Sequence, residues 1–258
     1  MKINKHRTAV ILCGGLGSRL GTLGKKIPKS MVKINNYPII WFIIKNLIKN
    51  SFNHLILPVG YKGSIIEKYV RKTFNNKKIQ IDIVDTGKNN QIAKRIFQIK
   101  KLIKSDNFLL MNGDAIFDFN LEKIFKNHEK NSYHMTFLGC ENQLAYGTVG
   151  VINKKVVNFE RNITFNSVQT KKNSKLTAYV YSGMSIMNKN ILNLNFKNFE
   201  NFERQLYPKI IKKYKCNFKE FKGFWHSIDN IKDIDNTKKI NNYIKFTGIK
   251  KITKKLNG

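Results

Sequence analysis

The chain has 258 residues, of which 41% are hydrophobic and 12% aromatic, so it can bury one substantial core and is not a disordered chain. No apolar stretch is long enough to cross a bilayer, and the apolar run ending at Cys13 lacks the hydrophobic region of a signal peptide, so we expect neither a membrane protein nor a secreted one. Lys and Arg number 48 against 16 Asp and Glu, a net charge of +32, but the lysines are spread along the whole chain, which favours compositional bias over a nucleic-acid-binding surface.

The first half of the chain alternates strand and helix patterns. Thr8–Cys13 is an apolar, β-branched run that ends in glycines, as a buried strand does before a phosphate-binding loop. Pro38–Asn50 repeats apolar residues at helical spacing, and its proline suits a helix start. The other elements expected in this half are strands over His54–Val59, Ile79–Val84 and Phe108–Met111 and helices over Ser64–Phe74, Ile92–Ile103 and Leu121–Glu129. This alternation predicts a parallel, doubly wound sheet.

After Glu129 the alternation breaks, and the pattern favours an antiparallel extension. Strands are expected over Met135–Cys140, Val149–Ile152, Val156–Glu160, Ala178–Met187 and Phe218–Phe221, and helices over Phe202–Lys213 and Ile231–Ile244. The polar segment Asn162–Lys175 lacks periodicity and is expected to be a loop. We therefore predict an α/β fold, a Rossmann-like, doubly wound, mostly parallel sheet with an antiparallel extension in its second half. One domain would cover residues 1–244, followed by a basic tail over 245–258.

A glycine-rich loop follows the first expected strand. It reads Leu12-Cys13-Gly14-Gly15-Leu16-Gly17-Ser18-Arg19-Leu20, and Pro28-Lys29-Ser30-Met31 follows at short range. Glycines let backbone N–H groups approach triphosphate oxygens without a Cβ clash, while Arg19 offers a planar fork for two oxygens and Lys29 a compact charge. The spacing matches neither the dinucleotide fingerprint nor a P-loop. A tight turn at the end of a core strand is the alternative.

These two segments resemble the opening signature of the sugar-1-phosphate nucleotidyltransferases, and the resemblance covers nearly the whole chain. Other segments that look like family motifs are Asn112-Gly113-Asp114, Tyr146-Gly147, Phe159-Glu160-Arg161, Ser182-Gly183 and Phe224-Trp225-His226-Ser227-Ile228-Asp229. The glucose-1-phosphate cytidylyltransferases look most similar, through Pro38-Ile39-Ile40-Trp41, Gly60-Tyr61-Lys62-Gly63, Val84-Asp85-Thr86-Gly87 and Gly223-Phe224-Trp225. Three departures from that subgroup are a missing longer segment before Asp85, Ala93-Lys94 in place of a glycine pair, and Arg161 in place of a lysine.

The resemblance implies a Mg²⁺-dependent enzyme that joins a nucleoside triphosphate, with CTP favoured, to a sugar 1-phosphate and releases pyrophosphate. The implied catalytic residues are Arg19, Lys29, Asp114 and Asp229, of which the two aspartates would hold the metal. The implied nucleotide contacts are Leu12, Gly14, Gly15, Gly17, Ser18, Arg19, Lys29, Thr86, Gly87, Arg95, Asn112 and Gly113. The implied sugar-phosphate contacts are Tyr146, Gly147, Glu160, Arg161, Ser182 and Gly183.

The same resemblance implies a cytoplasmic enzyme of NDP-sugar and cell-surface polysaccharide biosynthesis that forms a homo-oligomer, with no specific nucleic acid and no membrane as partner. Its chemistry is intelligible from the residues. A sugar phosphate is already ionised at neutral pH, so its attack on the α-phosphorus requires neutralisation and alignment of two anions more than proton transfer. Mg²⁺ prefers one or two carboxylates plus substrate phosphates, which suits Asp114 and Asp229.

Several alternatives stay open at this point. The same catalysis could use another base or sugar, as in a heptose-1-phosphate guanylyltransferase or a hexose-1-phosphate thymidylyltransferase, and a basic nucleic-acid-binding protein is the alternative of another class. Asp114 could be a turn former, Asp229 the N-cap of the last helix, and Glu160-Arg161 a solvated turn. Residues expected to pack and not to react or stack on a base are Cys13, Trp41, Trp225 and His226. Cys13, Cys140 and Cys216 fit no disulfide framework and indicate a reducing compartment.

Overall fold

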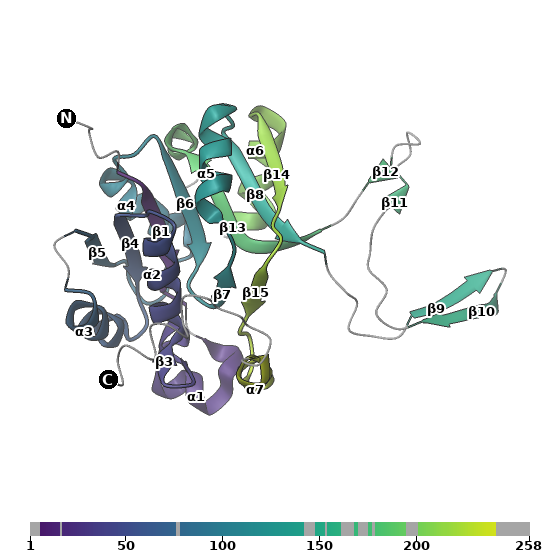
Figure 1. Ribbon diagram of the computed structural model, residues 1–258, viewed down its shortest axis with the longest axis horizontal. Coiled ribbons are helices and arrows are strands. Elements are labelled where there is room, and N and C mark those ends of the chain that lie inside the picture. The colour runs from purple at the N-terminus through teal and green to yellow at the C-terminus, as the bar shows by residue number, and fades with distance from the viewer. Residues whose placement is uncertain are drawn as a thin grey trace.

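A seven-stranded sheet forms the centre of the molecule in the computed structural model (Figure 1). The structure describes residues 6–15, 17–75, 78–141, 148–152, 154–160, 168–169, 175–176, 179–194 and 201–240. The strands lie in the order β14-β8-β13-β6-β1-β4-β5. Their bounds are β1 Thr8–Leu12, β4 His54–Val59, β5 Gln80–Asp85, β6 Asn107–Asn112, β8 Met135–Cys140, β13 Val180–Asn188 and β14 Cys216–Glu220.

The strands of this sheet run parallel except for one. The first four in the chain, β1, β4, β5 and β6, are mutually parallel. Strand β13 lies antiparallel to both of its neighbours, β6 and β8, and β14 then pairs with β8 in parallel. The predicted doubly wound, mostly parallel sheet is thus confirmed, and within this sheet its antiparallel part consists of β13.

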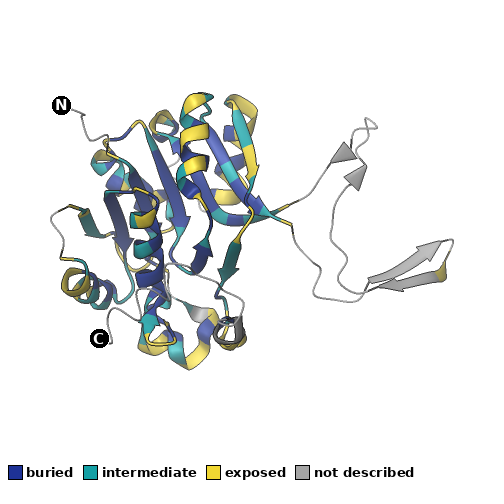
Figure 2. Cartoon of the chain, in the orientation of Figure 1, coloured by how far each residue is buried: buried dark blue, intermediate teal, exposed yellow. Residues whose placement is uncertain are grey.

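Helices cover both faces of the sheet. Their bounds are α1 Gly21–Lys26, α2 Ile39–Lys49, α3 Gly63–Thr73, α4 Ile92–Ile99, α5 Leu121–Lys130, α6 Tyr207–Lys213 and α7 Ile231–Ile240. Because side chains alternate along a strand, Ile11 and Leu109 face a core cluster shared with α2, α3, α5 and α7, whereas Val10 and Leu110 face a second cluster shared with α4 and α6. Figure 2 shows the central strands β1, β4 and β6 as buried along most of their length.

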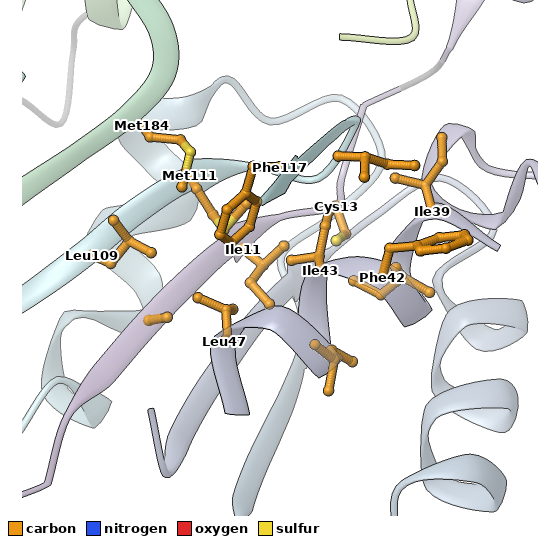
Figure 3. Close-up of a cluster of buried hydrophobic side chains, with 14 of the residues drawn as sticks. Ile11, Cys13, Ile39, Phe42, Ile43, Leu47, Leu109, Met111, Phe117 and Met184 are labelled. Atoms are coloured by element: carbon orange, nitrogen blue, oxygen red, sulfur yellow. The ribbon is translucent and has the colours of Figure 1, made fainter. Parts of the chain in front are cut away.

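Helix α2 illustrates why the sequence folds this way. Pro38 precedes its first residue in an extended conformation, which suits a helix start, and all but three of the helix's residues, Lys45, Ile48 and Lys49, are buried. Its Ile39 and Ile43 pack beside Cys13 at the end of β1, and Leu47 lies farther back beside the same strand (Figure 3). The end of β1 is therefore held in a dry core immediately before the glycine-rich loop.

Within the described part of the chain, four pairs of short strands accompany the central sheet. They are β2 Lys33–Ile34 with β3 Tyr37–Pro38, β7 Ala115–Asp118 with β15 Phe224–Ser227, β9 Thr148–Ile152 with β10 Lys155–Glu160, and β11 Val168–Gln169 with β12 Lys175–Leu176. Figure 1 shows β9 to β12 apart from the central sheet, beyond the ends of β8 and β13.

The structure corrects several predicted elements. The loop expected over Asn162–Lys175 contains β11 and the start of β12, because backbone pairing does not require the side-chain alternation on which the prediction relied. The helix expected over Phe202–Lys213 begins with π-helical turns over Phe202–Leu206, and the one expected over Ile92–Ile103 ends at Ile99 before a 3₁₀ turn. Residues 241–258, which include the end of the last predicted helix and the basic tail, lie outside the described residues.

Candidate active site

A cavity of about 300 Å³ opens at the carboxyl ends of β1 and β6. Strand β1 is where the strand order reverses, since β4 and β5 lie on one side of it and β6 on the other. Such a reversal leaves a crevice at the strand ends, where α/β sheets bind their ligands. The cavity is lined by Leu12, Cys13, Gly14, Gly15, Gly17, Lys29, Ser30, Asn90, Gln91, Ile92, Arg95, Asn112, Gly113 and Asp114.

The glycine-rich loop fits against its surroundings only because side chains are missing from it. A Cβ on Gly14 would lie 2.2 Å from Nη1 of Arg95, and a Cβ on Gly24 in α1 would lie 2.3 Å from the carbonyl oxygen of Gly17. Gly17 itself has φ +64°, a left-handed conformation that disfavours other residues. The loop is thus in close contact with Arg95 at Gly14 and with Gly24 at Gly17, while Gly15 is exposed.

Lys29 brings the two candidate metal ligands together. Its Nζ donates to Oδ2 of Asp114 at 2.6 Å and to Oδ1 of Asp229 at 2.9 Å. The pairing of β7 with β15 explains how residues so far apart in sequence meet, because the N–H of Ile228 also donates to the carbonyl oxygen of Asp114 at 3.0 Å. Two aspartates and one lysine therefore converge at the edge of the cavity.

Further contacts fix Asp229 in place. The exposed guanidinium of Arg19 lies 3.3 Å from Oδ1 of Asp229, and the hydroxyl of Ser227 donates to Oδ2 at 3.1 Å. Helix α7 is capped by Asn230 and Asp233, since Oδ1 of Asn230 accepts from the N–H of Asp233 and Oδ2 of Asp233 accepts from the N–H of Asn230. The N-cap alternative for Asp229 is therefore wrong, and its carboxylate faces Lys29.

The protonation states of this cluster follow from its ion pairs. Burial alone would lower the pKa of Lys29, but Asp114 and Asp229 together raise that pKa above its ordinary value. Burial likewise acts to raise the pKa of Asp229, and the hydrogen bonds and charges of Lys29, Ser227 and Arg19 outweigh it and lower that pKa. A charged Lys29 beside an ionised Asp229 is the state expected at neutral pH.

The donor set suits magnesium. Among the described residues no group of three or more His, Cys, Asp or Glu side chains could hold a metal. Two carboxylates at the edge of a phosphate-sized cavity are nevertheless what Mg²⁺ uses when substrate phosphates complete its coordination. Asp114 and Asp229, both near Lys29, fit that role.

Arg95 and Thr86 form the buried wall behind the loop. Nη1 of Arg95 donates to Oγ1 of Thr86 at 2.6 Å and to the carbonyl oxygen of Val59 at 3.1 Å, and Nη2 donates to those of Gly14 at 2.9 Å and Lys88 at 3.3 Å. Burial lowers the pKa of Arg95, partly offset by Asp85. Hydrogen bonds to a charged group contribute about 1.5–3 kcal/mol each, which offsets the cost of burying the guanidinium.

The predicted nucleotide contacts thus fall into three groups. Those that line the cavity are Leu12, Gly14, Gly15, Gly17, Lys29, Arg95, Asn112 and Gly113. Thr86 is 1% exposed and lies in the buried wall with Arg95. Gly87 follows Thr86 in the chain and has φ +87°. Arg19 is exposed and pairs with Asp229. The side chain of Ser18 lies outside the described residues.

Of the predicted sugar-phosphate contacts, the structure describes Ser182 and Gly183 in β13, and Gly183 lies beside the cavity residue Asn112. Ser182 is buried and donates to the carbonyl oxygen of Leu138 at 2.8 Å. Gly183 has φ +73°, and a Cβ there would lie 2.6 Å from Nδ2 of the cavity residue Asn112. Of the other predicted contacts, Tyr146, Gly147, Arg161 and the side chain of Glu160 lie outside the described residues. Their role stays a prediction.

Some residues that line the cavity were not predicted from the sequence. Asn90 and Gln91 line the cavity from the segment between β5 and α4, and Ser30 does so from the 3₁₀ turn over Lys29–Met31. Two polar amides directly before a helix were the available signal, since such residues often face a ligand at strand ends. Cys13 packs as predicted, because it is buried and burial raises its pKa to about 12. Trp41, at 2% exposed, packs as predicted too.

Comparison with known proteins agrees with this geometry. The sequence profile of the nucleotidyl transferase family matches residues 8–239. The D-glycero-alpha-D-manno-heptose 1-phosphate guanylyltransferase of Campylobacter jejuni is 32% identical over 219 residues, which cover 83% of this chain and 91% of that protein. The glucose-1-phosphate cytidylyltransferase of Salmonella typhimurium is 24% identical over 246 residues, which cover 87% and 92%. The crystal structure of HddC from Yersinia pseudotuberculosis complexed with GMP-PN is similar with a TM-score of 0.66 and 22% identity, over 90% of this chain and 98% of that one.

The chain therefore belongs to the nucleotidyl transferase family, and within it to the sugar-1-phosphate nucleotidyltransferases. Membership favours the enzyme over the nucleic-acid-binding alternative that the net charge of +32 left open. In the described part of the chain, no helix is both long and apolar enough to span a bilayer.

Proposed function

We propose that the protein transfers a nucleotidyl group from GTP or CTP to a hexose or heptose 1-phosphate, with Mg²⁺, and releases pyrophosphate. The observation that carries this proposal is the cluster of Lys29, Asp114 and Asp229 at the edge of a cavity bounded by a glycine-rich loop. This arrangement supplies positive charge, metal ligands and backbone donors at one place, which is what attack by one phosphate on another requires.

Each residue of the site would have a distinct role in this reaction. Backbone groups of the loop and Arg19 would bind the triphosphate, and Lys29 would neutralise charge that develops on the departing pyrophosphate. Magnesium, bound by Asp114, Asp229 and the substrate phosphates, would neutralise charge at the α-phosphate. The acceptor phosphate is already ionised, so no residue has to remove a proton from it. Arg161 would bind that phosphate and Glu160 the sugar hydroxyls.

Two observations bear on the base. The Asp85-Thr86-Gly87 segment resembles that of the cytidylyltransferases and so favours CTP as the nucleotide donor. Ala93 and Lys94, however, take the place of the glycine pair of that subgroup; Ala93 packs in the core and Lys94 is exposed. The relative with 32% identity is named as a guanylyltransferase and the one with 24% as a cytidylyltransferase. We therefore place GTP first and CTP second among the donors.

A matrix of substrates tests this proposal. GTP, CTP, UTP, ATP and dTTP would each be combined with heptose, glucose and mannose 1-phosphates, and pyrophosphate release measured. We expect one donor to give a kcat/KM at least about tenfold above the others, which corresponds to about 1.4 kcal/mol in transition-state binding. Release with no combination would contradict the proposed activity, and a preference for UTP, ATP or dTTP would contradict the choice of base while leaving the reaction class intact.

A further inference from the structure

Arg95 has a property that a ligand-contacting cation would not need. Its guanidinium is almost fully buried, with 4% of the residue exposed, and all four of its hydrogen bonds within the described chain go to the protein itself. None of the ion pairs among the described residues involves it. Its acceptors follow three neighbouring strands, since Gly14 comes after β1, Val59 ends β4, and Thr86 and Lys88 come after β5.

The bond to Gly14 fixes the direction of a peptide group in the cavity wall. Nη2 of Arg95 holds the carbonyl oxygen of Gly14 at 2.9 Å. A trans peptide is planar, so the N–H of Gly15 points away from the side on which that carbonyl oxygen lies. Gly14 is buried and Gly15 exposed, and both line the cavity. No hydrogen bond in the described part of the chain uses the N–H of Gly15.

Two glycines make room for this guanidinium. A Cβ on Gly14 would lie 2.2 Å from Nη1 of Arg95, and a Cβ on Gly60 would lie 2.6 Å from the same atom. A lysine at position 95 would keep the charge, but its ammonium has three donors on one nitrogen and no planar fork, so it could not reproduce the four bonds that Nη1 and Nη2 make. The glycines and the arginine are therefore matched in shape as well as in hydrogen bonding.

We propose that Arg95 is a positioning residue of the nucleotide site: it holds the Gly14–Gly15 peptide so that the N–H of Gly15 faces an acceptor atom of the bound nucleoside triphosphate. This inference rests on the proposed function, and it assigns Arg95 an action through the loop and not a contact with the nucleotide. A donor that is already oriented binds more tightly than one that must be ordered on binding. Loss of Arg95 should accordingly weaken nucleotide binding without weakening binding of the acceptor.

The test compares Arg95→Lys and Arg95→Ala with Lys101→Met, which removes an exposed cation that does not line the cavity. For each folded variant we would measure the nucleotide dissociation constant by calorimetry and the KM of both substrates. We expect Arg95→Lys to raise the nucleotide dissociation constant about tenfold, the scale of one oriented hydrogen bond, with the KM for sugar phosphate within about twofold of wild type. Lys101→Met should change neither.

Thr86→Val keeps the arginine and removes one of its acceptors, so it should give a smaller loss, about threefold, if larger changes at position 95 prevent folding. An unchanged nucleotide dissociation constant in folded Arg95→Lys, or in Thr86→Val where the changes at position 95 prevent folding, would overturn the inference. A wild-type protein that binds no nucleoside triphosphate would overturn the proposed function, and this inference with it.

Discussion

The two halves of the sheet contribute to the site in different ways. In the parallel half, β1, β4, β5 and β6 end side by side, and the segments that follow β1, β5 and β6 line the cavity. In the other half, β13 runs backward between β6 and β8, so it is the beginning of β13 that reaches the catalytic edge. The parallel half thus forms the cavity at the ends of its strands. The other half contributes the end of β8 and the beginning of β13, which are paired with each other.

Under the proposed function this difference would separate the two substrates. The proposed nucleotide side consists of residues fixed by the core behind them, such as Arg95 and Lys29. On the proposed acceptor side the structure describes contacts of Ser182 and Gly183 at the start of β13. We expect changes on the first side to affect nucleotide binding or the chemical step and changes on the second to affect acceptor binding, and the predictions below test that division.

The largest effect is expected from the two aspartates. Asp114→Asn or Asp229→Asn keeps the shape of the side chain and removes a charge that pairs with Lys29. We expect kcat to fall about a thousandfold, because both metal binding and the position of Lys29 are lost. Turnover by pyrophosphate release would be measured at several Mg²⁺ concentrations. Asp118→Asn is the matched control, since Asp118 pairs with Lys49 and does not line the cavity. Near-wild-type turnover of either variant would remove that aspartate from the mechanism.

The next prediction contrasts the two phosphate contacts. Lys29→Ala should lower kcat about a hundredfold, because the charge it faces builds up on the leaving pyrophosphate in the transition state. Arg161→Ala should instead raise the KM for the sugar phosphate about tenfold, because that charge is present from the start. Steady-state kinetics with each substrate varied in turn distinguish the two. An effect of Arg161→Ala on the nucleotide KM alone would place the acceptor site elsewhere.

A smaller effect, on the pH dependence of stability, concerns His128, which contacts strands from both halves of the sheet. His128 in α5 is hydrogen-bonded to Thr136 of β8 at 2.8 Å and to Asn107 of β6 at 3.2 Å. Burial, and to a lesser extent His134, lowers the pKa of His128 from 6.5 to about 4. Between these values the unfolded chain binds a proton that the folded chain does not. Stability that is present above pH 6.5 should therefore be lost as the pH falls, by about 3 kcal/mol at most.

Denaturant unfolding of wild type and His128→Gln between pH 7 and pH 4 would measure that loss. The variant should show a flatter dependence of the unfolding free energy on pH, while substitution of the exposed His6 by Gln should leave the slope of the wild type. If all three proteins lose the same stability as the pH falls, protonation of a group other than His128 causes the loss.

Much of the nucleotide side could be predicted from the sequence because its signals are local. Glycines next to a β-branched run located the loop, and Lys29 and Asp114 stood in short, recognisable contexts. The pairing of β7 with β15 was not predicted, although it is what brings Asp229 to Lys29, because a four-residue strand carries too little alternation to be detected. The place of Arg95 behind the loop was equally hidden, since burial of a cation depends on acceptors that three distant segments supply.

The pairing of Cys140 with Val180 has a consequence for how such enzymes could be altered. Residues 141–179 connect Cys140 at the end of β8 to Val180 at the start of β13, so both ends of this segment are held by paired strands. Closing a longer loop between fixed ends costs only about 0.6 kcal/mol for each doubling of its length. A segment of different length from another member of the family could therefore be grafted between these two residues. Under the proposal that Glu160 and Arg161 bind the acceptor, such a chimaera should keep its nucleotide preference and take the acceptor preference of the family member that supplied the segment.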